Sequence, residues 1–192
     1  MTQTDLIFTI DNHLDGSVCD EIIAKFDRDD RVTEGTTYSG SVQIDVKRTL
    51  DLYISDKDDW KEYDKVLCDS MLDGINLYCA KLRELVPELY PVPDLIGSDH
   101  NDYGYKVKKY RPGDYFHWHQ DETVNDKKVR KLAFIWYLND VEEDGYTEFY
   151  DGTKVYPKRG RLLVFPSCWT FVHRGYPPKQ EKYAITSFLY GV

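Results

Sequence analysis

Hydrophobic positions in the N-terminal half of the chain recur at helical spacing. Between residues 58 and 87 they return every three or four positions, which is the period of one helix face. Pro87 is the predicted end of this helix, because proline has no N–H to continue it. A shorter helix is predicted from Ser17, as its N-cap, to about Asp29, after a strand at residues 6–10. We interpret these helices as support for a sheet.

After residue 103 the pattern changes to that of short strands separated by turn residues. Strands spaced by about 8–12 residues, with no helices between them, are typical of a β-sandwich or jelly roll. The predicted fold is mainly β with a helical annex, a double-stranded β-helix (jelly-roll, cupin-like) core supported by N-terminal helices. We expect one domain over residues 1–192, with 1–100 as the support and 101–192 as the core. The predicted core strands cover residues 103–110, 115–121, 132–138, 147–150, 161–165, 170–173 and 183–190.

Four connecting segments complete the pattern. Residues 31–42 are rich in Gly, Thr and Ser and are predicted to be a loop, and two short strands follow between Val42 and Ser55. Lys47 and Arg48 lie between those strands, where a solvated basic turn is favoured over a place in a cleft. The proline-containing stretch 87–100 is a predicted connector. The polar residues 122–131 are a predicted loop that borders the site as a lid.

Composition and charge narrow the class of protein. A net charge of −9 over 192 residues argues against non-specific nucleic-acid binding, which needs a basic surface. The four cysteines show no paired spacing and are predicted to be reduced and mostly buried. The sequence shows neither a signal peptide nor an apolar run of about 18 residues, so a cytoplasmic protein with no membrane partner is expected.

The stretch from Tyr110 to Asp121 contains the candidate chemistry. His119 and Asp121 form a His-x-Asp pair, and residues two apart on a strand point to one face, so both can reach one ion. A third ligand from His173 would complete the two-His, one-carboxylate set typical of non-haem Fe(II). His117 shares the strand face but not the His-x-Asp spacing, so its role stays open. His13 and His100 are predicted to be solvated.

A cation placed near such a metal indicates what the open metal positions bind. Lys182 follows His173 and precedes an apolar strand, and an unpaired buried ammonium is costly. A dicarboxylate would chelate the metal at one end and pair with Lys182 at the other. Tyr110, Thr147 and Thr186 offer hydroxyl groups for the same pocket.

Taken together, these motifs resemble the 2-oxoglutarate- and Fe(II)-dependent oxygenases, specifically the prolyl 4-hydroxylase-like group. The resemblance covers residues 103–190, almost half of the chain, and its strength lies in the order and spacing of the set. The matching stretches are Tyr110-x-Pro-Gly, His119-x-Asp121, Tyr137-Leu-Asn139, Thr147-Glu-Phe149, Gly160 to Ser167, His173-Arg-Gly and Lys182-Tyr.

The resemblance implies a role for each matching residue. His119, Asp121 and His173 would ligate iron and act in catalysis. Lys182 would pair with the distal carboxylate of 2-oxoglutarate, with a hydrogen bond from Tyr110. Further residues of the co-substrate pocket would be Thr147 and Tyr137. Two positions depart from the family pattern: Phe188 replaces a common tryptophan, and Asp144-Gly145 replaces a Gly-Gly pair.

The implied activity is hydroxylation of a C–H bond, coupled to conversion of 2-oxoglutarate and O2 to succinate and CO2. Ascorbate is a further expected reductant. Peptidyl proline is the first substrate expectation, because of the subgroup resembled. The same chemistry on a small molecule, lipid or modified base stays open, as does a non-catalytic sandwich with a structural zinc. The short chain resembles free-standing microbial or phage members.

Two basic clusters flank the His-x-Asp stretch and bear on the substrate. They would attract an acidic substrate or peptide if they face the cleft. Solvent-facing strand positions and a solvated loop explain them equally well. The clusters comprise Lys106, Lys108, Lys109 and Arg111 before the motif, and Lys127, Lys128, Arg130 and Lys131 after it.

Overall fold

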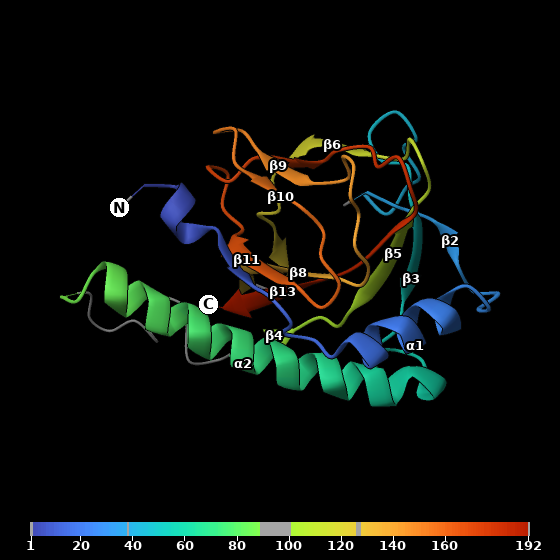
Figure 1. Ribbon diagram of the computed structural model, residues 1–192, viewed down its shortest axis with the longest axis horizontal. Coiled ribbons are helices and arrows are strands. Elements are labelled where there is room, and N and C mark those ends of the chain that lie inside the picture. The colour runs from blue at the N-terminus through green and yellow to red at the C-terminus, as the bar shows by residue number, and fades with distance from the viewer. Residues whose placement is uncertain (1, 38, 89–100, 126–127, 192) are drawn as a thin grey trace.

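Two antiparallel sheets lie face to face, and two helices cover the outer side of the larger one (Figure 1). The computed structural model describes residues 2–37, 39–88, 101–125 and 128–191. The predicted connector at 87–100 therefore lies almost wholly outside the described residues. In Figure 1 the smaller sheet is at the top and helices α1 and α2 run along the bottom.

The larger sheet has nine strands in the order β1-β11-β8-β13-β5-β3-β2, with β4 paired to β13 and β7 paired to β8. The smaller sheet has the order β10-β9-β12-β6. The strands of the larger sheet are β1 (Phe8–Ile10), β2 (Thr33–Glu34), β3 (Leu50–Tyr53), β4 (Asn101–Asp102), β5 (Lys106–Tyr110), β7 (Val124–Asn125), β8 (Lys128–Tyr137), β11 (Leu162–Pro166) and β13 (Lys182–Gly191). Those of the smaller sheet are β6 (Phe116–His119), β9 (Thr147–Phe149), β10 (Lys154–Val155) and β12 (His173–Gly175).

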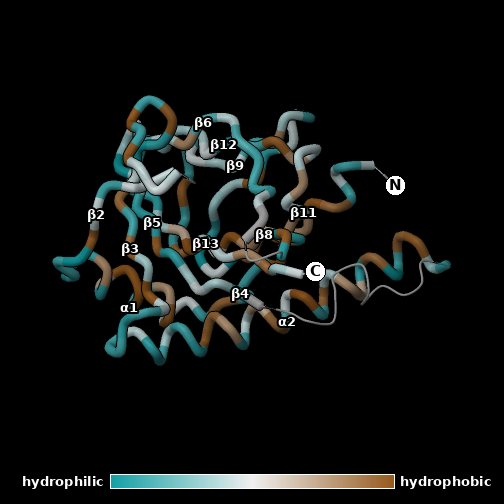
Figure 2. Tube along the Cα trace, turned by 180° about the vertical axis from the view of Figure 1, so that it is seen from behind, coloured by the Kyte–Doolittle hydropathy of each residue, from teal (hydrophilic) through white to brown (hydrophobic). Residues whose placement is uncertain are grey.

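The alternation of side chains along β8, β11 and β13 separates two apolar layers. One set of side chains, such as Phe134 and Val164, packs under the helices, and the other, such as Tyr137 and Phe165, packs between the sheets. Figure 2 shows hydrophobic residues along these central strands and alternating polarity along α2. The site therefore lies between the sheets, on the face of the larger sheet away from the helices.

The helices match the predicted periodicity, with corrected ends. Helix α1 covers Gly16–Phe26, and its N-cap is Asp15 rather than Ser17, because the Asp15 carboxylate accepts the Ser17 backbone N–H at 2.7 Å. Helix α2 covers Lys61–Leu85, after a 3-10 turn at Asp58–Trp60, and a second 3-10 turn, Thr4–Leu6, precedes β1. Gly74 lies inside α2, where an added Cβ would be 2.8 Å from Leu162 Cδ2. This glycine lets α2 approach the sheet closely.

Several predicted loops and strands in the N-terminal half were wrong. The segment 31–42 contains β2, and residues 42–55 hold one assigned strand, β3, instead of two. Backbone hydrogen bonds tie the segment before β3 to β6 and to the residue before it. Arg48 N–H donates to Tyr115 O at 2.8 Å, and His117 N–H donates to Val46 O at 2.9 Å. This segment therefore forms a wall beside the strand that ends in His119.

Two further expectations about segments and residues are corrected. The predicted loop 122–131 contains β7 and the start of β8, which pair as a hairpin extension. His13 was predicted to be solvated, but its side chain is 5% exposed and its Nε2 lies 2.9 Å from Ser70 O. His100 lies outside the described residues.

All four cysteines are free, and two of them, Cys19 and Cys79, are buried. None of the described helices has the length and apolar character needed to cross a membrane.

Candidate metal centre and co-substrate pocket

The pairing of β6 with β12 brings two distant histidines together. His119 ends β6, His173 begins β12, and the two are direct cross-strand partners. The predicted strand 115–121 was therefore too long, since Asp121 lies in the loop after β6. The prediction that His173 ends a strand was also wrong.

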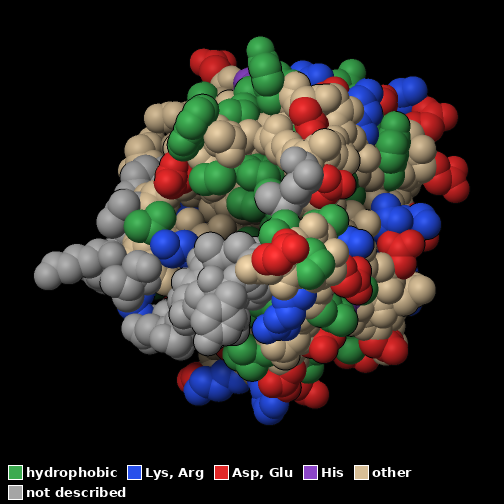
Figure 3. All heavy atoms as spheres, turned by 90° about the vertical axis from the view of Figure 1, so that its left-hand side faces the viewer, with side chains coloured by type: hydrophobic (Ala, Val, Ile, Leu, Met, Phe, Trp, Pro, Cys, Tyr) green, Lys and Arg blue, Asp and Glu red, His purple; other side chains and the backbone are tan. Residues whose placement is uncertain are grey.

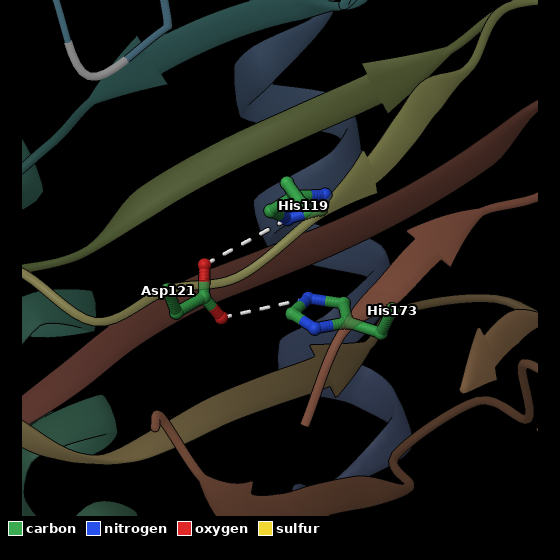
Figure 4. Close-up of side chains that lie close together, drawn as sticks. All are labelled: His119, Asp121 and His173. Atoms are coloured by element: carbon green, nitrogen blue, oxygen red, sulfur yellow. Dashed lines mark ion pairs between the residues drawn. The ribbon is translucent and has the colours of Figure 1, made fainter. Parts of the chain in front are cut away.

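The Asp121 carboxylate faces both imidazole rings from one side, with one oxygen toward each (Figure 4). Its Oδ1 is 3.7 Å from His119 Nε2, and its Oδ2 is 3.5 Å from His173 Nε2. One ligand atom from each residue falls within 4.8 Å of the others. This is the arrangement that three ligands of one metal ion require.

Backbone carbonyls orient both rings toward Asp121. His119 Nδ1 lies 2.7 Å from His117 O, and His173 Nδ1 lies 3.0 Å from Phe171 O. A carbonyl only accepts, so Nδ1 is the donor in each ring, and the neutral form of each ring presents its lone pair at Nε2. Burial, reinforced by the neighbouring His173, lowers the pKa of His119 to about 3, so this ring is neutral at physiological pH.

The loop that holds Asp121 is tied down by Arg130 of β8. The Arg130 guanidinium donates to the Asp121 backbone oxygen at 3.1 Å and to the Tyr190 hydroxyl at 2.7 Å. It also lies 3.8 Å from the Phe188 ring centroid, so the aromatic residue at this position supports a cation. The sequence motif does not reveal this positioning contact, because Arg130 is in a segment predicted to be a solvated loop.

Two nearby residues with possible ligand atoms, His117 and Cys168, stay outside the group. His117 is exposed, and its ring stacks on Tyr115 with centroids 4.4 Å apart. Cys168 bonds to Thr170 and is not among the three clustered ligands found in the described part of the chain. The donor set is thus two imidazoles and one carboxylate, without the thiolate common in structural zinc sites.

Lys182 lies deep in the pocket beside this centre. It is 2% exposed and is the cross-strand partner of Tyr110, whose ring centroid is 4.8 Å from its Nζ. Among the described residues its Nζ has one hydrogen-bond acceptor, Gly145 O at 2.6 Å, and no ion-pair partner. Burial lowers the pKa of Lys182 to about 7. A buried ammonium without a counter-ion is matched to an anionic ligand.

The hydroxyl-bearing residues predicted for the pocket lie on its walls. Tyr110, Thr147 and Thr186 line it together with Lys182. The Tyr137 and Thr147 hydroxyls are 2.7 Å apart, and burial raises the pKa of both Tyr110 and Tyr137. Both phenols are therefore neutral donors. The Gly145 carbonyl is a contact that sequence reasoning missed, although the departure from Gly-Gly at Asp144-Gly145 marked the loop.

An open cleft of about 420 Å³ continues outward from the candidate metal ligands. Lys47 lines it and is 3% exposed, so the predicted solvated basic turn was wrong for this residue. Lys106 and Lys108 line it too, whereas Lys109 points to the other face of β5, where it pairs with Glu181 at 2.9 Å. Which lysines of the basic cluster face the cleft follows from strand alternation.

Residues 105–190 match the family model of the 2OG-Fe(II) oxygenase superfamily. This segment is a 2OG-Fe(II) oxygenase domain. The superfamily uses Fe(II), 2-oxoglutarate and O2, as the sequence resemblance implied. The predicted enzyme class and the jelly-roll fold are confirmed.

The similarity to solved structures covers the N-terminal helices and strands as well as residues 105–190. A viral collagen prolyl hydroxylase from Paramecium Bursaria Chlorella virus-1, in a 2OG complex, is 18% identical with a TM-score of 0.65, covering 97% of both chains. A Pseudomonas putida prolyl-4-hydroxylase is 17% identical with a TM-score of 0.67, covering 97% of this chain and 93% of that one. A Trichoplax adhaerens prolyl hydroxylase, in complex with a hypoxia inducible factor peptide fragment, is 19% identical with a TM-score of 0.75, covering 97% and 84%. No curated protein sequence matches the chain.

Proposed function

We propose that His119, Asp121 and His173 bind Fe(II) and that Lys182 binds the distal carboxylate of 2-oxoglutarate. The observation that carries the proposal is the pairing of two features in one pocket. One is a convergent set of two imidazoles and a carboxylate, and the other is a buried cation with no ion-pair partner among the described residues. The donor set fits Fe(II), and three protein ligands leave positions for co-substrate and O2.

The chain's own residues bind and orient the reactants. Each hydrogen bond from Nδ1–H to a backbone carbonyl fixes the orientation of one ring. Both Nε2 atoms therefore point toward the metal position before the metal binds. Lys182 supplies charge at the far end of the pocket, and the Tyr110 hydroxyl donates to the same carboxylate. Thr147 and Tyr137 support that wall through their shared hydrogen bond. When bound, Fe(II) would let O2 oxidise a substrate C–H to C–OH while 2-oxoglutarate is converted to succinate and CO2.

The proposed substrate is a peptidyl proline, which would be hydroxylated at C4. The support is the fold-wide similarity to prolyl hydroxylases and the open cleft that reaches the ligands. A peptide passing along a cleft of this kind would present one side chain to the metal.

Anaerobic addition of Fe(II) and 2-oxoglutarate tests the centre directly. The expected result is a weak visible charge-transfer band that needs both additions and is lost in His173→Ala. The Lys182→Ala variant should need much more 2-oxoglutarate for the same band. Folded protein that binds Fe(II) but never develops the band would overturn the proposal. Mass spectrometry of proline-containing peptides, with succinate release, then tests the substrate.

A further inference from the structure

One face of β5 presents a column of three polar side chains toward the site. Tyr110, Lys108 and Lys106 are two residues apart and share this face, while Val107 and Lys109 point toward the helices. Their cross-strand partners on β13 are Lys182, Ala184 and Thr186 in the same order. Tyr110 lies beside Lys182 in the inner pocket, Lys108 lines both that pocket and the outer cleft, and Lys106 lines the outer cleft alone.

A third lysine approaches the same place from the opposite wall. Lys47 is held by a buried ion pair with Asp51 at 2.5 Å and by a bond to Thr36 O at 3.1 Å. The Lys47 and Lys108 ammonium groups lie 5.5 and 5.9 Å from the Phe116 ring centroid. Phe116 in turn stacks on His119 with ring centroids 3.6 Å apart. The cations are thus separated from a metal ligand by one aromatic ring.

The carboxylates nearby do not balance these cations. Asp51 is committed to Lys47 and to the Thr49 hydroxyl at 2.7 Å, and its oxygen is 4.0 Å from Lys106 Nζ. The other acid on the cleft wall, Asp121, belongs to the candidate metal centre. Lys108 is 9% exposed, and its ammonium has no hydrogen bond or ion pair to any described residue. A cation so buried and unpaired is costly unless a ligand neutralises it.

We propose that the substrate carries a carboxylate close to the reacting C–H bond, and that Lys106 and Lys108 bind it. The inference rests on the proposed oxygenase function of the same cleft, and it makes the favoured substrate an acidic peptide, with Asp or Glu beside the target residue. Lys47, fixed by Asp51, adds to the positive potential on the opposite wall. On a chain of net charge −9, whose surface would attract basic segments, this local field favours an acidic segment instead.

Only part of the basic cluster seen in the sequence can contribute charge to the cleft. Arg111 belongs to that cluster but pairs with Asp114 at 2.9 Å, and Lys109 pairs with Asp27 at 3.1 Å on the helix side. The face in Figure 3 intersperses basic and acidic side chains around hydrophobic ones among its described residues. Of the cluster before the motif, Lys106 and Lys108 are therefore the two lysines that line the cleft.

The test compares matched peptides with the full chain loaded with Fe(II) and 2-oxoglutarate. The probes are acetyl-Gly-Asp-Pro-Asp-Gly-amide and its neutral isostere acetyl-Gly-Asn-Pro-Asn-Gly-amide. N-acetylproline and its amide form a second pair that presents a small-molecule carboxylate. We expect kcat/KM for the acidic member of a pair to exceed that of the neutral member by at least about tenfold, the effect of one close charge pair. A preference in the peptide pair alone would indicate a peptide substrate, and a preference in the N-acetylproline pair alone would indicate a small acid.

Lys106→Met and Lys108→Met should each reduce this preference, and the double variant should abolish it. The exposed Lys61→Gln removes the same charge far from the cleft and should keep the preference. The charge-transfer band should persist in Lys106→Met, which separates failure of this inference from failure of the proposed function. If no probe is turned over, anaerobic calorimetric titration of the loaded protein with the same pairs gives the comparison by binding.

Three results would overturn the inference. The first is equal kcat/KM, or equal affinity, for the acidic and neutral members of both pairs. The second is a preference that survives in the double variant. The third is a Lys108→Met variant that loses 2-oxoglutarate affinity as severely as a Lys182 variant while Lys106→Met has no effect, which would assign Lys108 to the co-substrate.

Discussion

His119 and His173 are direct cross-strand partners in the pairing of β6 with β12, with ring centroids 4.3 Å apart. The ladder register alone therefore sets the spacing of two candidate metal ligands. Because side chains alternate along a strand, a slip of one residue would turn a ring to the opposite face. Asp121, two residues past His119, then needs only the short loop held by Arg130 to reach both rings.

Removal of either histidine should abolish tight metal binding without unfolding the protein. His173→Ala removes one of three ligands, so the affinity for Co(II), a spectroscopic substitute for Fe(II), should fall by at least about 100-fold. His117→Ala is the matched control, because this ring is exposed and stacked on Tyr115. Titration followed by Co(II) absorption checks both. Loss of Co(II) binding in the control, with binding kept in His173→Ala, would show that His117, not His173, completes the site.

Lys182→Met should weaken 2-oxoglutarate binding selectively. Methionine keeps the length of the side chain but removes the charge, and truncating one partner of a buried charge pair costs about 2–5 kcal/mol, or more than about 30-fold in affinity. Metal affinity should stay within about threefold, because Lys182 is not among the three clustered ligands. Isothermal titration with 2-oxoglutarate and with Co(II) measures the two effects separately. An equal loss of both affinities would contradict the proposed role.

The affinity for 2-oxoglutarate should fall as the pH rises above about 7. Burial lowers the pKa of Lys182 to about 7 in the protein without co-substrate, so the ammonium is present below that pH and is lost above it. A bound dianion favours the charged form, so binding takes up a proton, and Kd should rise by up to about tenfold per pH unit above 7. Calorimetry in two buffers of different ionisation enthalpy counts that proton. A Kd that is constant from pH 6 to 9 would exclude this linkage.

Gly160→Ala should destabilise the protein more than Gly152→Ala. Both glycines have positive φ, +77° and +90°, so both substitutions carry the strain of about 1–2 kcal/mol for a left-handed alanine. An added Cβ at Gly160 would also lie against the backbone oxygen of Leu14, whereas nothing lies within 4 Å of that position at Gly152. Overpacking of this kind adds about 1–3 kcal/mol to the free energy lost. Urea unfolding of the two variants gives the difference, and equal midpoints would contradict it.

Local sequence signals were sufficient for much of the fold and for the identity of the candidate site residues. The helical period over 58–87 predicted α2, since one apolar face at that spacing must be buried against a partner. The ordered set from Tyr110 to Lys182 was sufficient to predict the oxygenase class, now supported by the family match over residues 105–190. Element ends were less accurate, because caps such as Asp15 depend on which side chain reaches the first free backbone N–H groups.

Only the tertiary structure decided which charged residues are buried and what they face. Lys47 was expected in solvent, and Lys108 was interpreted equally well as facing the cleft or facing solvent. The sequence shows charge and periodicity but not what covers a strand. The pairing of β5 between β3 and β13 placed Lys108 on the inner face, and Asp51 on the neighbouring strand holds Lys47 there. The Arg130 contact and the Gly145 carbonyl beside Lys182 likewise join segments that are distant in the chain. Residue type thus determined the available chemistry, and strand register determined which groups meet, because register is a long-range property of pairing.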